Sequence, residues 1–291
     1  MQGDPVTHEL SVLASPLAGR WRVLVDDVLR DAAASLRSHA LPTQVQVHHA
    51  RAGLKQAAAL LGLVPDTCRS QAKSARRAVG HVQQALGCAR DAQAIVEALD
   101  DLARRGKAGQ SQFQHLRDRL VEAIDPDTTI LKTQAAGLDR ALASIQASVI
   151  DSSSGKDIIK RAQKAFREAR ALRPRKRAHA SAKALHNFRR AAVLHRYQIA
   201  FLDAGGMAKR VRHLERLRKL LGRNHDLGLL KEALVELKPR AQACMLRPVL
   251  GIISDTQRRL RRKAIWLGRR LFRRKAGQEL SRSLQAVSVG R

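Results

Sequence analysis

Apolar residues recur every three to four positions along most of this chain, with polar residues between them. This spacing puts the apolar side chains on one face of an α-helix, whereas a half-buried β-strand would alternate apolar and polar residues. We find no run with that alternation. The pattern predicts helices at about 18–38, 43–61, 67–86, 89–104, 109–124, 128–149, 157–172, 177–204, 207–221, 225–237 and 247–274.

Glycine and serine mark the breaks between these predicted helices. Gly62 and Gly87 lie near predicted helix ends, where a left-handed backbone favours glycine, and Gly222 separates two later helices. The serine-rich run 151–156 is the strongest linker candidate. The sequence therefore predicts an all-α protein of two helical bundles. Its expected parts are a first unit at 15–151, a linker at 152–156, a second unit at 157–275 and a C-terminal tail at 276–291.

Two sequence signals occur twice, in the same order and at similar spacing. One is a histidine with an arginine three positions later, and the other is a Leu-Gly pair with an aspartate four positions after the glycine. The first copy comprises His48, Arg51, Gly87 and Asp91, and the second comprises His186, Arg189, Gly222 and Asp226. This repeated order indicates an internal duplication.

The charge balance narrows the expected partner to a polyanion. The chain has 55 lysines and arginines against 25 acidic residues, which gives a formal net charge of +30. Such an excess repels itself unless a counter-charge is nearby. Nucleic acid, an acidic membrane or inorganic polyphosphate would supply it, and a generally basic, solvated surface is the alternative.

The basic residues around both histidines fall on narrow helical faces. Cations one helical turn apart, about 5.4 Å, can donate to successive phosphates, and each arginine can hold two phosphate oxygens. A histidine beside such an anion should have its charged form favoured. The candidate anion-binding residues are His48, Arg51, Lys55, Lys73, Arg76, Arg77, His186, Arg189, Arg190, Arg196, Lys209, Arg212, Arg216 and Lys219.

These basic faces could also be ordinary solvated surfaces. We see no acidic residues interleaved with them to form pairs one turn away, which disfavours that interpretation. Asp91 and Asp226 are expected to cap the following helices or to hold a neighbouring arginine, rather than to act in catalysis. The arginine-rich helix at 247–274 is expected to dock on the bundle and to present a non-specific anion-binding face, with an acidic membrane as a less favoured partner.

Other features argue against a metal site, a membrane span and an enzyme. The three cysteines lie far apart without metal-ligand spacing, and such a sparse set suits a reducing compartment. We find neither a signal peptide nor a run of about 18 apolar residues, which predicts a soluble, cytoplasmic protein. We also find no P-loop and no clustered carboxylates for Mg²⁺, so we expect no enzyme, no metal and no cofactor.

The duplicated signals resemble the motifs of the CHAD domain, a family named for its conserved histidines and α-helical fold. The resemblance covers about residues 15–275 and rests on the segments 47–51, 86–91, 186–197 and 221–226. It implies two four-helix bundles with pseudo-twofold symmetry and, between them, a basic groove that binds inorganic polyphosphate. Stand-alone members, the phosins, associate with bacterial polyphosphate granules, so a cytoplasmic, granule-associated protein is expected.

The chain departs from the family pattern at several positions. Val193 stands where the second repeat usually has a cation, and Ala58 and Ala59 replace arginines expected late in the first histidine helix. We expect Arg190, His195 and the helix that follows them to compensate for these losses.

Our leading hypothesis from the sequence is therefore a non-enzymatic polyphosphate-binding protein. A non-specific nucleic-acid-binding protein that uses the same cations is the alternative, although aromatic residues, which base stacking usually needs, make up only 3% of the chain. An enzyme acting on phosphoanhydrides is a third hypothesis, and metal-dependent phosphate release would support it.

Overall fold

The computed structural model describes residues 16–38, 43–64, 69–105, 110–122, 134–140, 143, 155–175, 180–202, 206–237 and 243–289. Nearly all of these residues lie in helices and none lies in a strand, so the prediction of an all-α protein is confirmed. None of the described helices is both long and apolar enough to cross a lipid bilayer. The helices are α1 (Pro16–Arg37), α2 (Thr43–Leu61), α3 (Arg69–Arg105), α4 (Gln110–Glu122), α6 (Gly155–Leu172), α7 (Ala182–Leu202), α8 (Ala208–Glu236), α9 (Ala243–Leu271) and α10 (Arg274–Val289).

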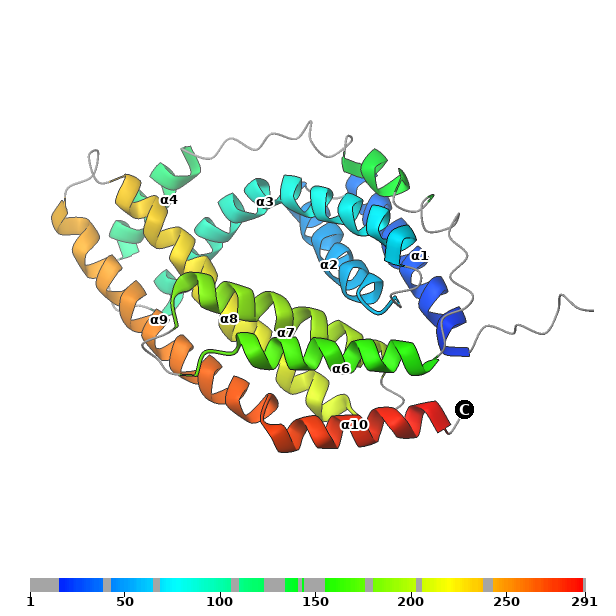
Figure 1. Cartoon of the computed structure of the whole chain (residues 1–291). Helices are drawn as coiled ribbons and strands as arrows, with labels where there is room; N and C mark the ends of the chain where they lie inside the picture. The colour runs from blue at the N-terminus through cyan, green and yellow to red at the C-terminus, as the bar shows by residue number, and fades with distance from the viewer. Residues whose placement is uncertain are drawn as a thin grey trace, which may run out of the picture.

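The helices pack in the same order in the two halves of the chain (Figure 1). In the first half α2 contacts α1 and α3, and α3 contacts α4; in the second half α7 contacts α6 and α8, and α8 contacts α9. Across the halves, α1 packs against α6, α2 against α7 and α3 against α8, while α10 packs on α6. A duplication would produce this order, but the duplication and the two four-helix bundles themselves stay predictions.

Buried side chains form two clusters, and each cluster draws on both halves of the chain. The larger cluster includes Trp21 of α1 and Phe188 of α7. The smaller cluster includes Phe113 of α4 and Leu230 of α8. The long helices α3, α8 and α9 contribute apolar residues to both clusters, so neither cluster belongs to one half alone.

The predicted domain boundaries are only partly within the described structure. Residues 151–154 lie outside the described residues, and residues 155 and 156 begin α6. Of the helix predicted at 128–149, the structure describes 134–140 and 143, which are helical. The division into units at 15–151 and 157–275 therefore stays a prediction.

The C-terminal segment, which we expected to be a tail, is mostly helical. Residues Arg274–Val289 form α10, which packs against α6. Ala276, Leu280 and Leu284 are buried and follow one another every four residues. This spacing gives α10 a single apolar face, which is sufficient reason for the segment to dock as a helix.

The breaks predicted at Gly87 and Gly222 do not exist. The two helices predicted on either side of Gly87 are one continuous helix, α3, and those on either side of Gly222 are α8. A glycine inside a helix costs about 1 kcal/mol relative to alanine, which is too little to end a helix that packing stabilises. Asp91 and Asp226 lie within these helices, so the prediction that they cap helices was wrong, whereas the alternative that they hold a neighbouring arginine stays a prediction.

Polar side chains tie the C-terminal end of α2 to two other helices. The indole Nε1 of Trp21 in α1 donates a hydrogen bond of 2.7 Å to the carbonyl of Leu60. The amide Nε2 of Gln198 in α7 donates one of 3.0 Å to the carbonyl of Ala59. Both bonds are buried, and they add a second partner to carbonyls that already accept backbone hydrogen bonds from Gly62 and Leu63.

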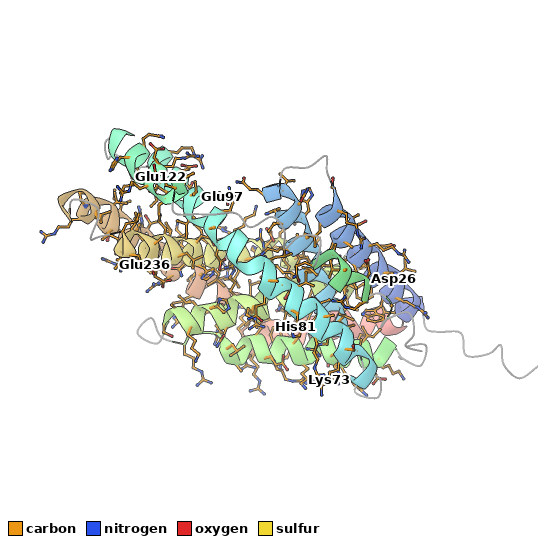
Figure 2. The ribbon with its side chains drawn as sticks, turned by 90° about the horizontal axis from the view of Figure 1, so that it is seen from above. Asp26, Lys73, His81, Glu97, Glu122 and Glu236 are labelled. Carbon is orange, nitrogen blue, oxygen red and sulfur yellow. The ribbon has the colours of Figure 1, made fainter. Side chains whose placement is uncertain are left out.

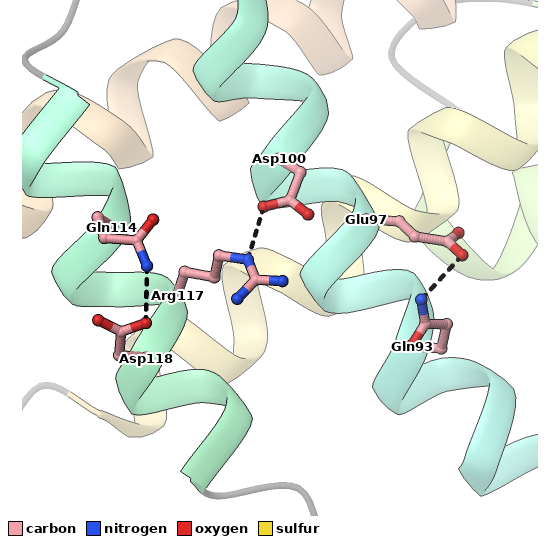
Figure 3. Close-up of polar contacts among 6 residues, drawn as sticks. All are labelled: Gln93, Glu97, Asp100, Gln114, Arg117 and Asp118. Carbon is pink, nitrogen blue, oxygen red and sulfur yellow. Dashed lines mark hydrogen bonds and ion pairs between the residues drawn. The ribbon is translucent and has the colours of Figure 1, made fainter. Parts of the chain in front are cut away.

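Ion pairs attach α4 and α8 to the C-terminal half of α3. Figure 3 shows Arg117 of α4, whose Nε lies 3.1 Å from Oδ1 of Asp100. On α8, Nη2 of Arg223 lies 2.6 Å from Oδ2 of Asp101. Two consecutive aspartates of α3 thus each neutralise a cation from a different helix.

His195 of α7 is fully buried among aromatic rings. Its ring centroid lies 5.7 Å from those of Phe166 and Phe272, and neither ring nitrogen has a hydrogen-bond partner among the described residues. Burial, and secondly the nearby Arg210, hold the pKa of His195 well below its usual value. The expectation that His195 adds to the anion-binding surface was therefore wrong, because the side chain faces the core.

Candidate anion-binding site

The second copy of the His–Arg signal lies against the second copy of the Leu-Gly signal. The ring of His186 in α7 lies 5.4 Å from that of His225 in α8, measured between centroids. Nη2 of Arg189 lies 3.7 Å from the point where a Cβ on Gly222 would stand. A Cβ at Gly222 would be in ordinary van der Waals contact with the guanidinium, so alanine would fit there, whereas a larger side chain would have to displace Arg189.

These residues border a cavity of about 240 Å³ among α7, α8 and α9, here named the α7–α8 cavity. Besides His186, Arg189 and His225, the residues that line it include Lys183 at the start of α7 and Arg261 of α9. Five basic side chains from three helices thus converge on one small space. The cations outnumber the carboxylates there, because the lining includes one acidic residue, Glu232.

Arg261 is held in place by an uncharged partner. Its Nε donates a hydrogen bond of 3.1 Å to Oδ1 of Asn224, and Asn224 is only 6% exposed. The backbone carbonyl of Asn224 in turn accepts a hydrogen bond of 3.1 Å from Nε2 of Gln257. An amide orients a guanidinium without neutralising it, so the charge of Arg261 remains available to an anion.

The charge state of His186 depends on its neighbours in α7 and α3. Burial lowers the pKa of His186 below its usual value of 6.5, and the positive charges of Arg189 and Arg190 lower it further. The carboxylate of Asp91 in α3 acts in the opposite direction. Asp91 thus lies close enough to His186 to affect its pKa, although Asp91 does not line the cavity.

The pKa of His225 is lowered in the same way. Burial is the main cause, followed by the charges of Arg189 and His186, while the carboxylates of Asp91 and Glu232 partly oppose them. Both histidines are therefore mainly neutral at neutral pH in the ligand-free protein. An anion that neutralised Arg189 would remove one cause of this depression and favour the protonated rings.

The first copy of the His–Arg signal is built differently around its arginine. Nη1 of Arg51 in α2 donates a hydrogen bond of 3.1 Å to the carbonyl of Gln83 in α3, and it lies 3.9 Å from the Cβ position of Gly87. His48 is exposed and Lys55 is half-buried. None of these first-half residues borders the α7–α8 cavity.

Arg196 forms an ion pair within the protein. Its Nε lies 2.9 Å from Oε2 of Glu215 in α8, and Nη2 of Arg218 lies 2.7 Å from the other oxygen of the same carboxylate. The expectation that no acidic residue interleaves with the basic faces was therefore wrong at Glu215. The charge of Arg196 is therefore already partly neutralised by Glu215, so less of it is available to an anion.

The other predicted residues are exposed and border neither this cavity nor the second one described below. On the second half these are Arg190, Lys209, Arg212, Arg216 and Lys219. On the first half Lys73, Arg76 and Arg77 lie near the N-terminus of α3, and Figure 2 shows Lys73 and Glu97 towards opposite ends of that helix. At about 1.5 Å per helical residue, Arg77 lies roughly 21 Å along α3 from Asp91.

A second cavity, of about 510 Å³, lies between α8 and α9 and is here named the α8–α9 cavity. Lys231 of α8 and Arg258, Arg261 and Arg262 of α9 line it. We expected the cations of α9 to form a non-specific surface, and none of them was among the predicted site residues. Their spacing of three to four residues was the available signal, but cations occupy several faces of this helix and the sequence did not show which face meets α8.

Both cavities have side chains suited to binding an anion. Guanidinium and ammonium groups supply charge-assisted hydrogen bonds, and neutral ones come from Gln257 at both cavities and from Asn224 at the α7–α8 cavity. Within the described part of the chain, no group of three or more His, Cys, Asp or Glu side chains could hold a metal ion. The arrangement therefore suits a ligand with several negatively charged oxygens.

Comparison with solved structures shows what this fold is similar to. PptA from Streptomyces chartreusis superposes with a TM-score of 0.58 at 15% sequence identity, over 91% of this chain and 99% of that one. The CHAD domain from the plant Ricinus communis gives a TM-score of 0.49 at 16% identity, over 93% of this chain and 92% of that one. At these identities the first likeness concerns the fold alone.

Comparison at the level of sequence concerns the family. No curated protein sequence matches the chain significantly. The family model named CHAD domain, however, matches residues 23–235, which span most of α1 to α8 and include both copies of the His–Arg signal. The chain therefore belongs to the CHAD domain family.

Proposed function

We propose that this protein binds inorganic polyphosphate without catalysing a reaction on it, and that the α7–α8 cavity is the centre of binding. The observation that carries the proposal is the convergence of His186, Arg189, His225 and Arg261 on one cavity. Each unit of a polyphosphate chain carries a negative charge and oxygens that accept hydrogen bonds. The general link of the CHAD family with polyphosphate supports this choice of anion.

The driving force is electrostatic. Each cation that contacts a phosphate releases a counterion from the polyanion, so the affinity falls steeply as the salt concentration rises. A net charge of +30 adds long-range attraction, which raises the rate of encounter. A protein held in this way by a multivalent polymer would collect on polyphosphate granules, which is the cellular location that we propose.

Non-specific binding of nucleic acid is the second candidate, and one observation favours it. Trp266 of α9 is 57% exposed, and the guanidinium of Arg270 lies 4.7 Å from its ring centroid. An exposed indole beside a cation could stack on a base while the cation binds a phosphate. This surface presents a single aromatic ring, whereas single-strand binding surfaces generally stack several bases in succession.

A competition experiment separates the two candidates. Labelled polyphosphate is titrated with the protein at about 0.15 M salt, and unlabelled polyphosphate or DNA is then added as competitor. We expect polyphosphate to displace DNA at far lower concentrations of charge than DNA needs to displace polyphosphate. Equal displacement in both directions would contradict the proposal and leave a general basic surface.

Matched variants locate the site. In Arg189→Ala/Arg261→Ala two cations of the α7–α8 cavity are lost, and we expect polyphosphate affinity to fall about 10- to 100-fold because each lost contact is charge-assisted. In Lys164→Ala/Arg167→Ala two exposed cations of α6 are lost with the same change in net charge. If both double variants lose affinity equally, the cavity is not the binding centre.

The absence of catalysis is part of the proposal and has its own test. The protein is incubated with polyphosphate and Mg²⁺ or Mn²⁺, and released orthophosphate is measured. We expect no release above that in a sample without protein. Metal-dependent release that disappears in His186→Ala would replace binding by phosphoanhydride hydrolysis as the function.

A further inference from the structure

The α8–α9 cavity is the larger of the two cavities described above. Binding of polyphosphate at the α7–α8 cavity gives it no role. Its charged lining residues are all cationic, namely Lys231, Arg258, Arg261 and Arg262. Four positive groups around one space repel one another, and this repulsion destabilises the ligand-free protein. Such a cluster is relieved when a polyanion enters.

The two cavities adjoin. Arg261 and Gln257 line both of them, so the side chain of Arg261 stands where one cavity meets the other. The hydrogen bond from Arg261 to Asn224 fixes the guanidinium in this position. A group bound on either side of Arg261 would therefore share the same cation.

One face of α9 forms the floor of the second cavity. Its lining residues run from Ser254 through Gln257 and Arg261 to Ile265, at spacings of three to four residues. At about 1.5 Å per residue, this face extends roughly 16 Å along the helix. A linear polymer of phosphates can follow such a face, whereas a single phosphate cannot occupy it.

The cations of this face are weakly neutralised by the protein. Arg258 pairs with Asp255 at 3.0 Å, but both side chains are mostly exposed, and exposed pairs of this kind contribute little. The cavity lining itself includes no aspartate or glutamate. Charge on an incoming anion therefore meets little competition from internal carboxylates.

We infer that the α7–α8 and α8–α9 cavities form one continuous track, in which Lys231, Arg258 and Arg262 bind further phosphate units of a chain anchored at Arg189 and Arg261. This inference rests on the proposed function. It adds that the protein selects for length, because a short chain fills one cavity whereas a long chain fills both. The affinity for long chains then exceeds that for short ones through the effective concentration of the second segment.

The experiment compares tripolyphosphate with a long-chain polyphosphate by isothermal titration calorimetry on the full chain. For the unsubstituted protein we expect each protein chain to bind two tripolyphosphate molecules, one in each cavity. With the long polymer we expect a single polymer segment to occupy both cavities. In Lys231→Ala/Arg262→Ala we expect one tripolyphosphate per chain and about a 10-fold loss of affinity for the long polymer. The slope of log affinity against log salt should fall by about one to two units, because two phosphate contacts are lost.

The control is Lys164→Ala/Arg167→Ala, which changes the net charge equally but touches neither cavity. Melting temperatures of all proteins establish that the variants are folded. Unchanged long-chain affinity in Lys231→Ala/Arg262→Ala would overturn the inference and leave polyphosphate binding at the α7–α8 cavity intact. An equal loss in the control would overturn the inference and indicate a general basic surface. Failure of the unsubstituted protein to bind either ligand would overturn the proposed function and the inference with it.

Discussion

Arg189 of α7 lies over Gly222 of α8, with Nη2 of the guanidinium 3.7 Å from the absent Cβ. The equivalent residues of the first half, Arg51 and Gly87, are related in the same way at 3.9 Å. In each half, the arginine of one sequence signal thus faces the glycine of the other. The glycine of each Leu-Gly signal therefore lies in a continuous helix beside an arginine of the neighbouring helix, and it does not end its own helix.

Substitutions of Gly222 by side chains of different size should affect helix stability and ligand affinity differently. A Cβ fits at 3.7 Å, so Gly222→Ala should leave polyphosphate affinity within about twofold and stabilise α8 by up to about 1 kcal/mol. The larger side chain of Gly222→Leu must displace the guanidinium of Arg189, and we expect about a 10-fold loss of affinity. Binding titrations and chemical denaturation measure the two effects.

The control for that series is Gly80→Leu in α3, since nothing lies within 4 Å of a Cβ at Gly80. We expect this variant to bind polyphosphate as the unsubstituted protein does. Normal binding by a folded Gly222→Leu variant would show that the position of Arg189 over α8 is unimportant.

Polyphosphate binding should strengthen as the pH falls. His186 and His225 have pKa values below 6.5 in the free protein, and a bound anion favours their protonated forms. The bound state then holds more protons than the free state, so linkage requires the affinity to rise as the pH is lowered through and below about 6.5. Calorimetry in two buffers of different ionisation enthalpy should detect proton uptake on binding.

The pH dependence should be reduced in His186→Asn/His225→Asn, which keeps polar side chains but removes both titrating rings. His81→Asn is the matched control, because His81 is exposed on α3 and borders neither cavity. An affinity that is equally pH-dependent in the double variant would assign the effect to other groups.

Periodicity predicted the helices well, and the reasons for its errors are physical. The apolar spacing located α2 at its observed bounds, because one buried face is a local property of a helix. It divided α3 and α8 at their glycines, because local rules treat glycine as a helix end. At each glycine the helix instead continues and packs beside an arginine more than 30 residues away in the chain, such as Arg189 for Gly222.

The candidate site was predicted in part. His186 and Arg189 were identified because their signal occurs twice, and both line a cavity. Arg196 was assigned to the ligand because its partner, Glu215, comes from the next helix. Arg261 was missed because α9 carries arginines on several faces, and its hydrogen bond to Asn224 and its place in both cavity linings depend on packing between helices. In each of these cases the role of the residue depends on which side chain of another helix it contacts. A single sequence does not show these contacts.

Protein stability should decrease in mild acid because of His195. Its folded-state pKa lies well below 6.5, so below that pH the unfolded chain binds the extra proton and the free energy of unfolding falls. The slope reaches about 1.4 kcal/mol per pH unit for one such histidine. We expect urea denaturation between neutral and mildly acidic pH to show this loss.

The apolar substitution His195→Leu tests the assignment. It has no titrating group and leaves no buried ring nitrogen unpaired, so the variant should lose less stability in acid than the unsubstituted protein. His186 and His225 also have lowered pKa values, so part of the slope should persist. An unchanged slope in the variant would exclude His195 as the source.

Gly268 of α9 should be the least replaceable glycine in the contact between α7 and α9. A Cβ there would lie 2.9 Å from Cζ of Phe188, which is 1% exposed and cannot move aside without disturbing the larger cluster. We expect Gly268→Ala to lower the free energy of unfolding by about 1–3 kcal/mol through overpacking. Gly251→Ala in the same helix is the control, since nothing lies within 4 Å of its Cβ position and helix propensity alone should stabilise it by up to about 1 kcal/mol. Opposite signs for the two substitutions in urea denaturation would establish that Phe188 packs directly on the backbone of α9, whereas equal stabilisation would contradict that contact.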